Sequence, residues 1–178
     1  MEEPKKMTST IVKTTTGLTI TTPKRKSWAL IFFLSLITFQ FTNGIIQSLF
    51  FASNLPTTER IIIFILSVVV VYFTLKALLW QLKGVKEISI SNDNLTLSKL
   101  SPLWTKTKTY KLSEVKNIDI KDETVSEGPT AMLQLLRIID QIKITFSYGY
   151  ETITATSGID QTEALELKNL LKNKIESN

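Results

Sequence analysis

Two long apolar segments dominate the pattern of hydrophobic and polar positions. Residues 28–52 are 25 consecutive uncharged positions, and residues 61–82 form a second apolar run whose single charge is Lys76. A helix of about 20 apolar residues is long enough to cross the hydrocarbon core of a bilayer. Because a proline, two charges and small polar residues lie between the runs, the sequence predicts a transmembrane helical hairpin with a tight turn at 53–60.

Two other interpretations of these runs are less favoured. The runs could be core helices of a soluble protein, but a domain of this size could not cover two helices that are apolar on all sides. The first run is also too long for the apolar region of a signal peptide, and it ends in LFFASN without a cleavage pattern. We therefore expect both helices to remain in the mature protein.

Basic residues flank the predicted hairpin on both sides, whereas the turn contains only Arg60. The positive-inside bias therefore predicts an inner (cytoplasmic) membrane protein with an external turn and with residues 1–27 and 83–178 in the cytoplasm. Lys76 lies about two turns from the cytoplasmic edge, so we expect it to extend to the headgroups; pairing with an acidic residue of a membrane partner is the alternative. The predicted membrane-interface anchors are Lys24, Arg25, Lys26, Trp28, Lys76 and Trp80.

The first apolar segment carries polar residues that recur every three or four positions and therefore share one helical face. These residues are Gln40, Asn43, Gly44 and Gln47. Amide groups are costly in lipid, so this face must contact protein. The second segment offers only Ser67 and Thr74 as polar partners. We therefore predict that a second copy of the chain or another membrane protein covers the face, with pairing to the second segment as the alternative.

From Val85 onward the apolar positions alternate with a period of two, which is typical of half-buried strands. The expected strands are a hairpin over 86–100 that turns at 92–94, then 104–112, 116–122 and 138–148, and finally 150–156, which follows Gly149. The pattern then becomes helical. Asp160 and Glu163 have the spacing of a capping box, and an apolar stripe follows at Leu167, Leu170, Leu171 and Ile175. The fold class predicted is a membrane α+β protein, in which a transmembrane hairpin joins a small antiparallel sheet or partial barrel closed by a C-terminal helix.

The N-terminal segment has a similar composition. Residues 9–22 are rich in Thr, Ile and Val around a central Gly17, which favours a β-hairpin that could add strands to the C-terminal sheet. A disordered tail is the alternative.

The order of these elements resembles the bacterial membrane-anchored proteins that carry a pleckstrin-homology-like domain. The resemblance is carried by KRKSW (24–28), WQLKGVKEISI (80–90), NLTL (94–97), YKLSEVKNIDI (110–120) and SGIDQTEALELKNLL (157–171). It implies a pleckstrin-homology-like fold over 83–178 and a scaffold or binding role without an assigned activity. Eukaryotic pleckstrin-homology domains often bind phosphoinositides through a basic loop, but the corresponding turn here, SNDNL (91–95), contains no basic residue.

Composition excludes several classes of chemistry. The 178 residues include neither Cys nor His, so disulfides, zinc fingers, haem ligation by these residues, thiol nucleophiles and Ser-His-Asp triads are ruled out. An all-carboxylate metal site or a Ser/Lys pair stays open. The carboxylates at 119–123 are expected at a strand end, and Glu163 and Glu166 on a solvated face of the C-terminal helix. Both clusters lack a second catalytic partner, and no Gly-rich phosphate loop is present. We therefore expect neither an enzyme nor a cofactor or metal.

The net charge of +5 lies entirely in residues 1–82, which contain eight basic and three acidic residues, whereas residues 83–178 have 13 of each. A nucleic-acid-binding protein should carry its excess positive charge on the folded domain. We therefore expect no nucleic-acid partner.

Two surfaces of the C-terminal region are candidates for binding. Lys106 and Lys108 share a strand face and could contact anionic lipid, but a solvated edge strand is the favoured interpretation. Residues 130–139 are more apolar than one strand face requires. They could form a core strand or a short helix, or a partner-binding lip built from Met132, Leu133 and Leu136.

These features favour a non-enzymatic scaffold that presents a domain at the cytoplasmic face of the membrane and acts on another membrane protein or complex. The alternatives are an immunity or inhibitor protein that protects the membrane from a toxin, an anionic-lipid sensor, and an oligomeric transporter subunit.

Overall fold

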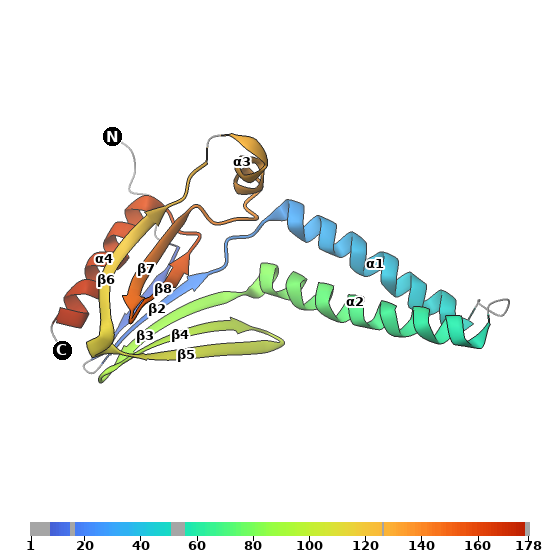
Figure 1. Cartoon of the computed structure of the whole chain (residues 1–178), viewed down its shortest axis with the longest axis horizontal. Helices are drawn as coiled ribbons and strands as arrows, with labels where there is room; N and C mark the ends of the chain where they lie inside the picture. The colour runs from blue at the N-terminus through green and yellow to red at the C-terminus, as the bar shows by residue number, and fades with distance from the viewer. Residues whose placement is uncertain (1–7, 15–16, 51–55, 126, 177–178) are drawn as a thin grey trace. The chain divides into compact units, whose positions relative to one another are not determined.

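The computed structural model describes residues 8–14, 17–50, 56–125 and 127–176. The chain forms two compact units (Figure 1). One contains residues 26–82, and the other combines residues 1–25 with residues 83–178. The residues 51–52 of the predicted first span and 53–55 of the predicted turn lie outside the described residues.

The first unit consists of two long helices, α1 (Trp28–Phe50) and α2 (Thr57–Lys83). They have 23 and 27 residues, and both are long and apolar enough to cross a membrane. α2 begins four residues before the apolar run, because Arg60 N–H already donates to the Pro56 carbonyl and the helix continues through the polar residues that precede Ile61.

α1 and α2 pack as an antiparallel pair through small and polar residues. Thr38 Oγ1 donates to Thr74 Oγ1 at 3.0 Å, and the Arg60 guanidinium donates to the Ser48 carbonyl at 3.2 Å. Between these contacts, a Cβ at Gly44 would meet Ser67 Oγ at 3.4 Å, so the glycine lets the helices approach closely.

The second unit contains two antiparallel sheets (Figure 1). The first has five strands in chain order: β1 (Thr10–Lys13), β2 (Gly17–Pro23), β3 (Val85–Ser91), β4 (Asn94–Ser101) and β5 (Trp104–Lys111). The second contains β6 (Val115–Asp122), β7 (Ile142–Tyr148) and β8 (Glu151–Ser157). The helical elements are η1 (Leu112–Glu114), α3 (Gly128–Leu135) and α4 (Gln161–Glu176). The predicted α+β class is thus confirmed, and so are the six strands and the closing helix of the C-terminal region.

The N-terminal hairpin adds to the C-terminal sheet, as the Thr/Ile/Val pattern suggested. β2 pairs with β3 over seven residues, from Gly17 opposite Ser91 to Pro23 opposite Val85. At one end of this ladder the chain continues through Lys24 and Arg25 toward α1. At the same end it returns from α2, where Lys24 N–H donates to the Gly84 carbonyl at 2.8 Å. The residues that precede the helical hairpin in the chain and those that follow it therefore belong to one β-sheet.

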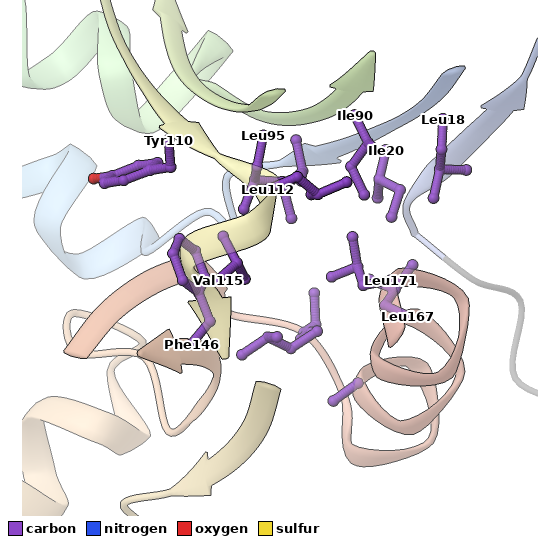
Figure 2. Packing of buried hydrophobic residues seen from close by; sticks show 14 residues of the cluster. Leu18, Ile20, Ile90, Leu95, Tyr110, Leu112, Val115, Phe146, Leu167 and Leu171 are labelled. Carbon is purple, nitrogen blue, oxygen red and sulfur yellow. The ribbon is translucent and has the colours of Figure 1, made fainter. Parts of the chain in front are cut away.

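The core lies between the two sheets and α4 (Figure 2). Ile20, Ile88 and Ile90 from the first sheet and Ile144 from the second are almost completely buried, and Leu167 of α4 is 0% exposed. The Tyr110 ring contacts Phe146 edge-on, with the ring centroids 5.4 Å apart, and so joins the two sheets. The predicted apolar stripe of the C-terminal helix is what closes this core.

Two sequence-based expectations for this unit were wrong. The strand expected from residue 138 begins at Ile142, because residues 136–141 turn back from α3 with Arg137 in a left-handed conformation (φ 57°). Glu163 was assigned to a solvated helix face, but it is 5% exposed, and its carboxylate accepts hydrogen bonds from Ser9 N–H at 2.7 Å and Thr8 Oγ1 at 2.8 Å. Glu163 thus ties the N-terminal strand region to α4.

Candidate functional site

The predicted polar face of α1 divides into two parts. Gly44 lies against α2, whereas Gln40, Asn43 and Gln47 are exposed. The buried residues of α1, Ile31 and Ser48, lie on the helical face that contains the contact with Thr74, roughly opposite the three amides at 100° per residue. Among the described residues, no hydrogen bond from α2 reaches these amides. We call Gln40, Asn43 and Gln47 the amide stripe.

The other polar groups of α1 are satisfied within the helix. Ser35 Oγ donates to the Ile31 carbonyl and Thr42 Oγ1 to the Thr38 carbonyl, at 2.8 and 2.7 Å. A hydroxyl bonded to its own helix can face lipid at little cost, whereas an amide has two donors and an acceptor that a helix backbone does not satisfy. The amide stripe is therefore the part of α1 that requires a partner.

The predicted membrane-interface anchors have different environments. Trp28 is 69% exposed at the start of α1, and Lys26 is exposed. Lys76 lies 6.0 Å from the centre of the Tyr72 ring one turn earlier, and Trp80 follows one turn later on the same helix. Extension of the Lys76 ammonium to the headgroups stays a prediction, with an acidic residue of a membrane partner as the alternative.

Lys24 and Arg25 make ion pairs inside the β unit instead of extending freely. Lys24 Nζ lies 3.1 Å from Asp140 Oδ1 with its side chain 8% exposed, and Arg25 lies 3.7 Å from Asp160. The charge of Lys24 is thus used within the domain, which differs from its predicted role as a lipid anchor.

Asp140 is the centre of a buried polar cluster. Its second carboxylate oxygen accepts hydrogen bonds from Lys86 Nζ at 3.2 Å and Ser157 Oγ at 2.6 Å, and Lys86 also donates to the Ser157 carbonyl at 3.1 Å. We call Lys24, Lys86, Asp140 and Ser157 the clasp. It joins the segment before α1 (Lys24), β3 (Lys86), the segment before β7 (Asp140) and β8 (Ser157).

The clasp sets the charge states of its members. Burial alone would raise the pKa of Asp140, but Lys86, the Ser157 hydroxyl and Lys24 together lower it to about 2. Burial lowers the pKa of Lys86, and Asp140 offsets this only in part, while Lys24 and Lys99 act in the same direction as burial. At neutral pH the Asp140 carboxylate is therefore ionised beside the side chains of Lys24 and Lys86.

Lysines form a row across the inner face of the five-stranded sheet. The register places Lys86 of β3 directly opposite Lys99 of β4, and Lys99 directly opposite Lys106 of β5. Along these strands the same face continues to Ile88 and Ile90, to Leu97 and Leu95, and to Lys108 and Tyr110. The inner face thus changes from apolar in the core to cationic at the end of the sheet where the chain connects to the helices.

A groove of about 270 Å³ lies along this row. One side is formed by Lys86, Lys99, Lys106 and Lys108, with Leu97 and Tyr110 as apolar lining, and the other by Thr152–Ala155 of β8. β5 and β8 are edge strands of their sheets, so the groove opens between two edges. Among the described residues, Lys86 is the one groove lysine with a carboxylate within ion-pairing distance. We call this feature the lysine groove.

The sequence pattern indicated Lys106 and Lys108 as a candidate surface, but not their neighbours Lys86 and Lys99. The signal for these lysines lies in three segments, in each of which a lysine has the same two-residue period as the apolar residues. The segments are KEISI (86–90), LTLSK (95–99) and KTKTY (106–110). Each pattern predicts an inner-face lysine at one strand end, but only the register shows that the three lysines are neighbours. β5 is an edge strand, so the solvated-edge interpretation of Lys106 and Lys108 agrees with their position.

Residues 130–139 form a short helix and the turn after it, and not a core strand. Met132 is 64% and Leu133 37% exposed, while Leu136 is half-buried. Gln134 is the buried member of α3, because its side-chain amide donates to the Glu123 carbonyl and accepts from Val125 N–H. Met132 and Leu133 of the predicted lip therefore lie on the surface, and their contact with a partner stays a prediction.

The carboxylate cluster at 119–123 is used in local pairs. Asp119 accepts a hydrogen bond from Lys168 at 2.9 Å, which together with the Ile120 backbone N–H lowers the pKa of Asp119. Asp122 accepts hydrogen bonds from Thr124, and Glu123 pairs with Lys143. These carboxylates are engaged as exposed structural contacts.

No protein-family model and no curated protein matches this chain. The amide stripe, the clasp and the lysine groove therefore have to be interpreted from their own chemistry.

Proposed function

We propose that the protein is a membrane-anchored, non-enzymatic interaction module. In this proposal α1 and α2 cross the inner membrane as a hairpin. The β unit, with a pleckstrin-homology-like fold, is held at the cytoplasmic surface, and the amide stripe binds a membrane partner. Tethering near the bilayer raises the effective concentration of the domain toward other membrane proteins.

The topology in this proposal is supported by the pairing of β2 with β3. Residues on both sides of the helical hairpin share one sheet, so they must lie on one side of any bilayer that the hairpin crosses. The basic residues beside both ends of the hairpin favour the cytoplasmic side. Reporter fusions at both termini test this arrangement, and reporters active outside the cytoplasm would refute it.

The observation that carries the interaction role is the amide stripe. Three amides lie on the exposed face of an otherwise apolar helix, away from the contacts with α2. A polar group in hydrocarbon is stabilised by hydrogen bonds to a neighbouring helix. The partner is therefore a membrane-embedded helix, either of another protein or of a second copy of the chain.

Replacing the stripe with leucine tests the interaction. We expect Gln40→Leu/Asn43→Leu/Gln47→Leu to weaken the complex roughly 20-fold, because interhelical hydrogen bonds average about 0.6 kcal/mol each. Light scattering of the full-length protein in detergent and crosslinking in native membranes measure the complex size.

The matched control is Ser35→Ala/Thr42→Ala, which removes polar groups of α1 that are already bonded to the helix backbone. The control should retain the complex. A complex of unchanged size in the leucine variant would contradict a role for the amide stripe in assembly.

A further inference from the structure

The lysine groove contains more ammonium groups than the neighbouring carboxylates of the described residues compensate. Lys86, Lys99 and Lys106 lie directly opposite one another on adjacent strands, and like charges in this arrangement destabilise a sheet. The Asp140 carboxylate compensates the charge of Lys86, but the same carboxylate also pairs with Lys24. A row of facing lysines that leaves repulsion uncompensated indicates a site whose negative charge comes from a ligand.

The dimensions and lining of the groove limit the class of ligand. Its volume of about 270 Å³ lies below the roughly 300–1,000 Å³ typical of pockets for drug-sized molecules. Ammonium groups line one side, and the Thr152 and Thr154 region of β8 lines the other. Lysine ammonium groups bind phosphate oxygens as point charges, and threonine hydroxyls can donate additional hydrogen bonds.

The position of the groove in the chain indicates the source of that ligand. Lys86 follows Lys83, the last residue of α2, by three positions, which is at most about 10 Å of extended chain. The register then places Lys99 and Lys106 beside Lys86 at the same end of the sheet. The turn that joins β4 to β5 lies at this end too, and its Leu103 is 53% exposed. Anionic headgroups are the phosphates most concentrated near such a tether.

We propose that the lysine groove binds a phosphate-bearing anion, supplied by the headgroup of an anionic phospholipid. The lipid source of the ligand rests on the proposed membrane anchoring. The binding of phosphate by the groove does not depend on that anchoring. It differs from recognition through the turn at 91–95, which contains no basic residue. The bound headgroup relieves the repulsion among the lysines and holds the domain against the membrane surface.

The test compares two variants of the full-length protein in detergent micelles. Lys99→Gln/Lys106→Gln removes two charges from the groove, and the matched control Lys111→Gln/Lys121→Gln removes two exposed charges outside it. Native mass spectrometry measures phosphatidylglycerol binding, and equilibrium dialysis measures binding of glycerol 3-phosphate.

We expect the groove variant to bind phosphatidylglycerol about 30-fold more weakly than the wild type, from roughly fivefold for each lysine lost. The control should bind within about threefold of the wild type, since its charges lie away from the ligand. Without ligand, the groove variant should unfold at the same or a higher urea concentration, because the facing charges are gone. This second measurement separates loss of the site from loss of the fold.

Three results would overturn the inference: equal losses in the groove variant and the control, no binding of either anion by the wild type, or a groove variant that is less stable without ligand. Glycerol 3-phosphate binding as tight as the lipid's would support the phosphate site and refute the headgroup as its source. Extraction of the protein from vesicles by alkaline washing would refute the proposed anchoring instead, and the soluble-anion measurement would still test the groove.

Discussion

Removing the Asp140 carboxylate is the sharpest test of how the β unit joins its chain segments that precede and follow the helical hairpin. Asp140→Asn keeps the size of the side chain but leaves the ammonium groups of Lys24 and Lys86 without their carboxylate in a site where Asp140 itself is 13% exposed. The pKa of Asp140 is lowered from its ordinary value of 3.8 to about 2 in the folded protein. This difference corresponds to about 2 kcal/mol of stability at neutral pH. Breaking a buried ion pair costs about 3–5 kcal/mol. We therefore expect a loss of about 2–5 kcal/mol.

The pH dependence has a defined sign. Because the pKa of Asp140 is depressed in the folded protein, its contribution is present above pH of about 4 and is lost as the pH falls from about 4 to about 2. The difference in unfolding free energy between the wild type and Asp140→Asn should therefore narrow over this interval.

The measurement is urea unfolding of the full-length protein in detergent micelles, followed by Trp104 fluorescence in a Trp28→Phe/Trp80→Phe background. Asp119→Asn is the matched control, since Asp119 also pairs with a lysine but is 69% exposed in its side chain, and it should leave the urea midpoint nearly unchanged. A loss below about 1 kcal/mol in Asp140→Asn, or a loss that does not change between pH 7 and pH 2, would refute the clasp as a source of stability.

Two further substitutions test the core and the surface of the same unit. Leu167→Ala should destabilise the domain by about 2–5 kcal/mol in the same urea assay, because Leu167 of α4 is 0% exposed in the core that α4 forms with the two sheets. A loss below 1 kcal/mol would show that the helix does not close the core. Leu133→Glu should leave the domain folded, as judged by circular dichroism and the urea midpoint, because Leu133 is 37% exposed on α3. Unfolding of this variant would assign Leu133 to the core, and loss of a crosslinked partner with the fold intact would assign it to a binding lip.

Much of the local structure could be predicted because it depends on residues close together in the chain. The apolar runs specify α1 and α2, the period of two specifies the strands, and Asn92 and Gly149 adopt the positive φ that the turns near them require. The expectation that residues 9–22 form a hairpin was confirmed for the same reason. These features follow from backbone propensity and from the periodicity of the side chains.

The functional surfaces depended on contacts between distant segments. Lys86, Lys99 and Lys106 become neighbours only through the pairing of three strands, and the buried Glu163 accepts a hydrogen bond from Ser9, 154 positions earlier. Likewise, the four residues of the predicted polar face of α1 looked equivalent until contact with α2 separated Gly44 from the amide stripe.

The sequence by itself thus determined the elements, the two apolar helices, and the absence of His and Cys chemistry. The tertiary structure decided which polar groups are paired within the protein and which are exposed on its surface. The physical reason is that periodicity reports which face of an element is apolar, whereas burial and charge pairing depend on which other element covers that face.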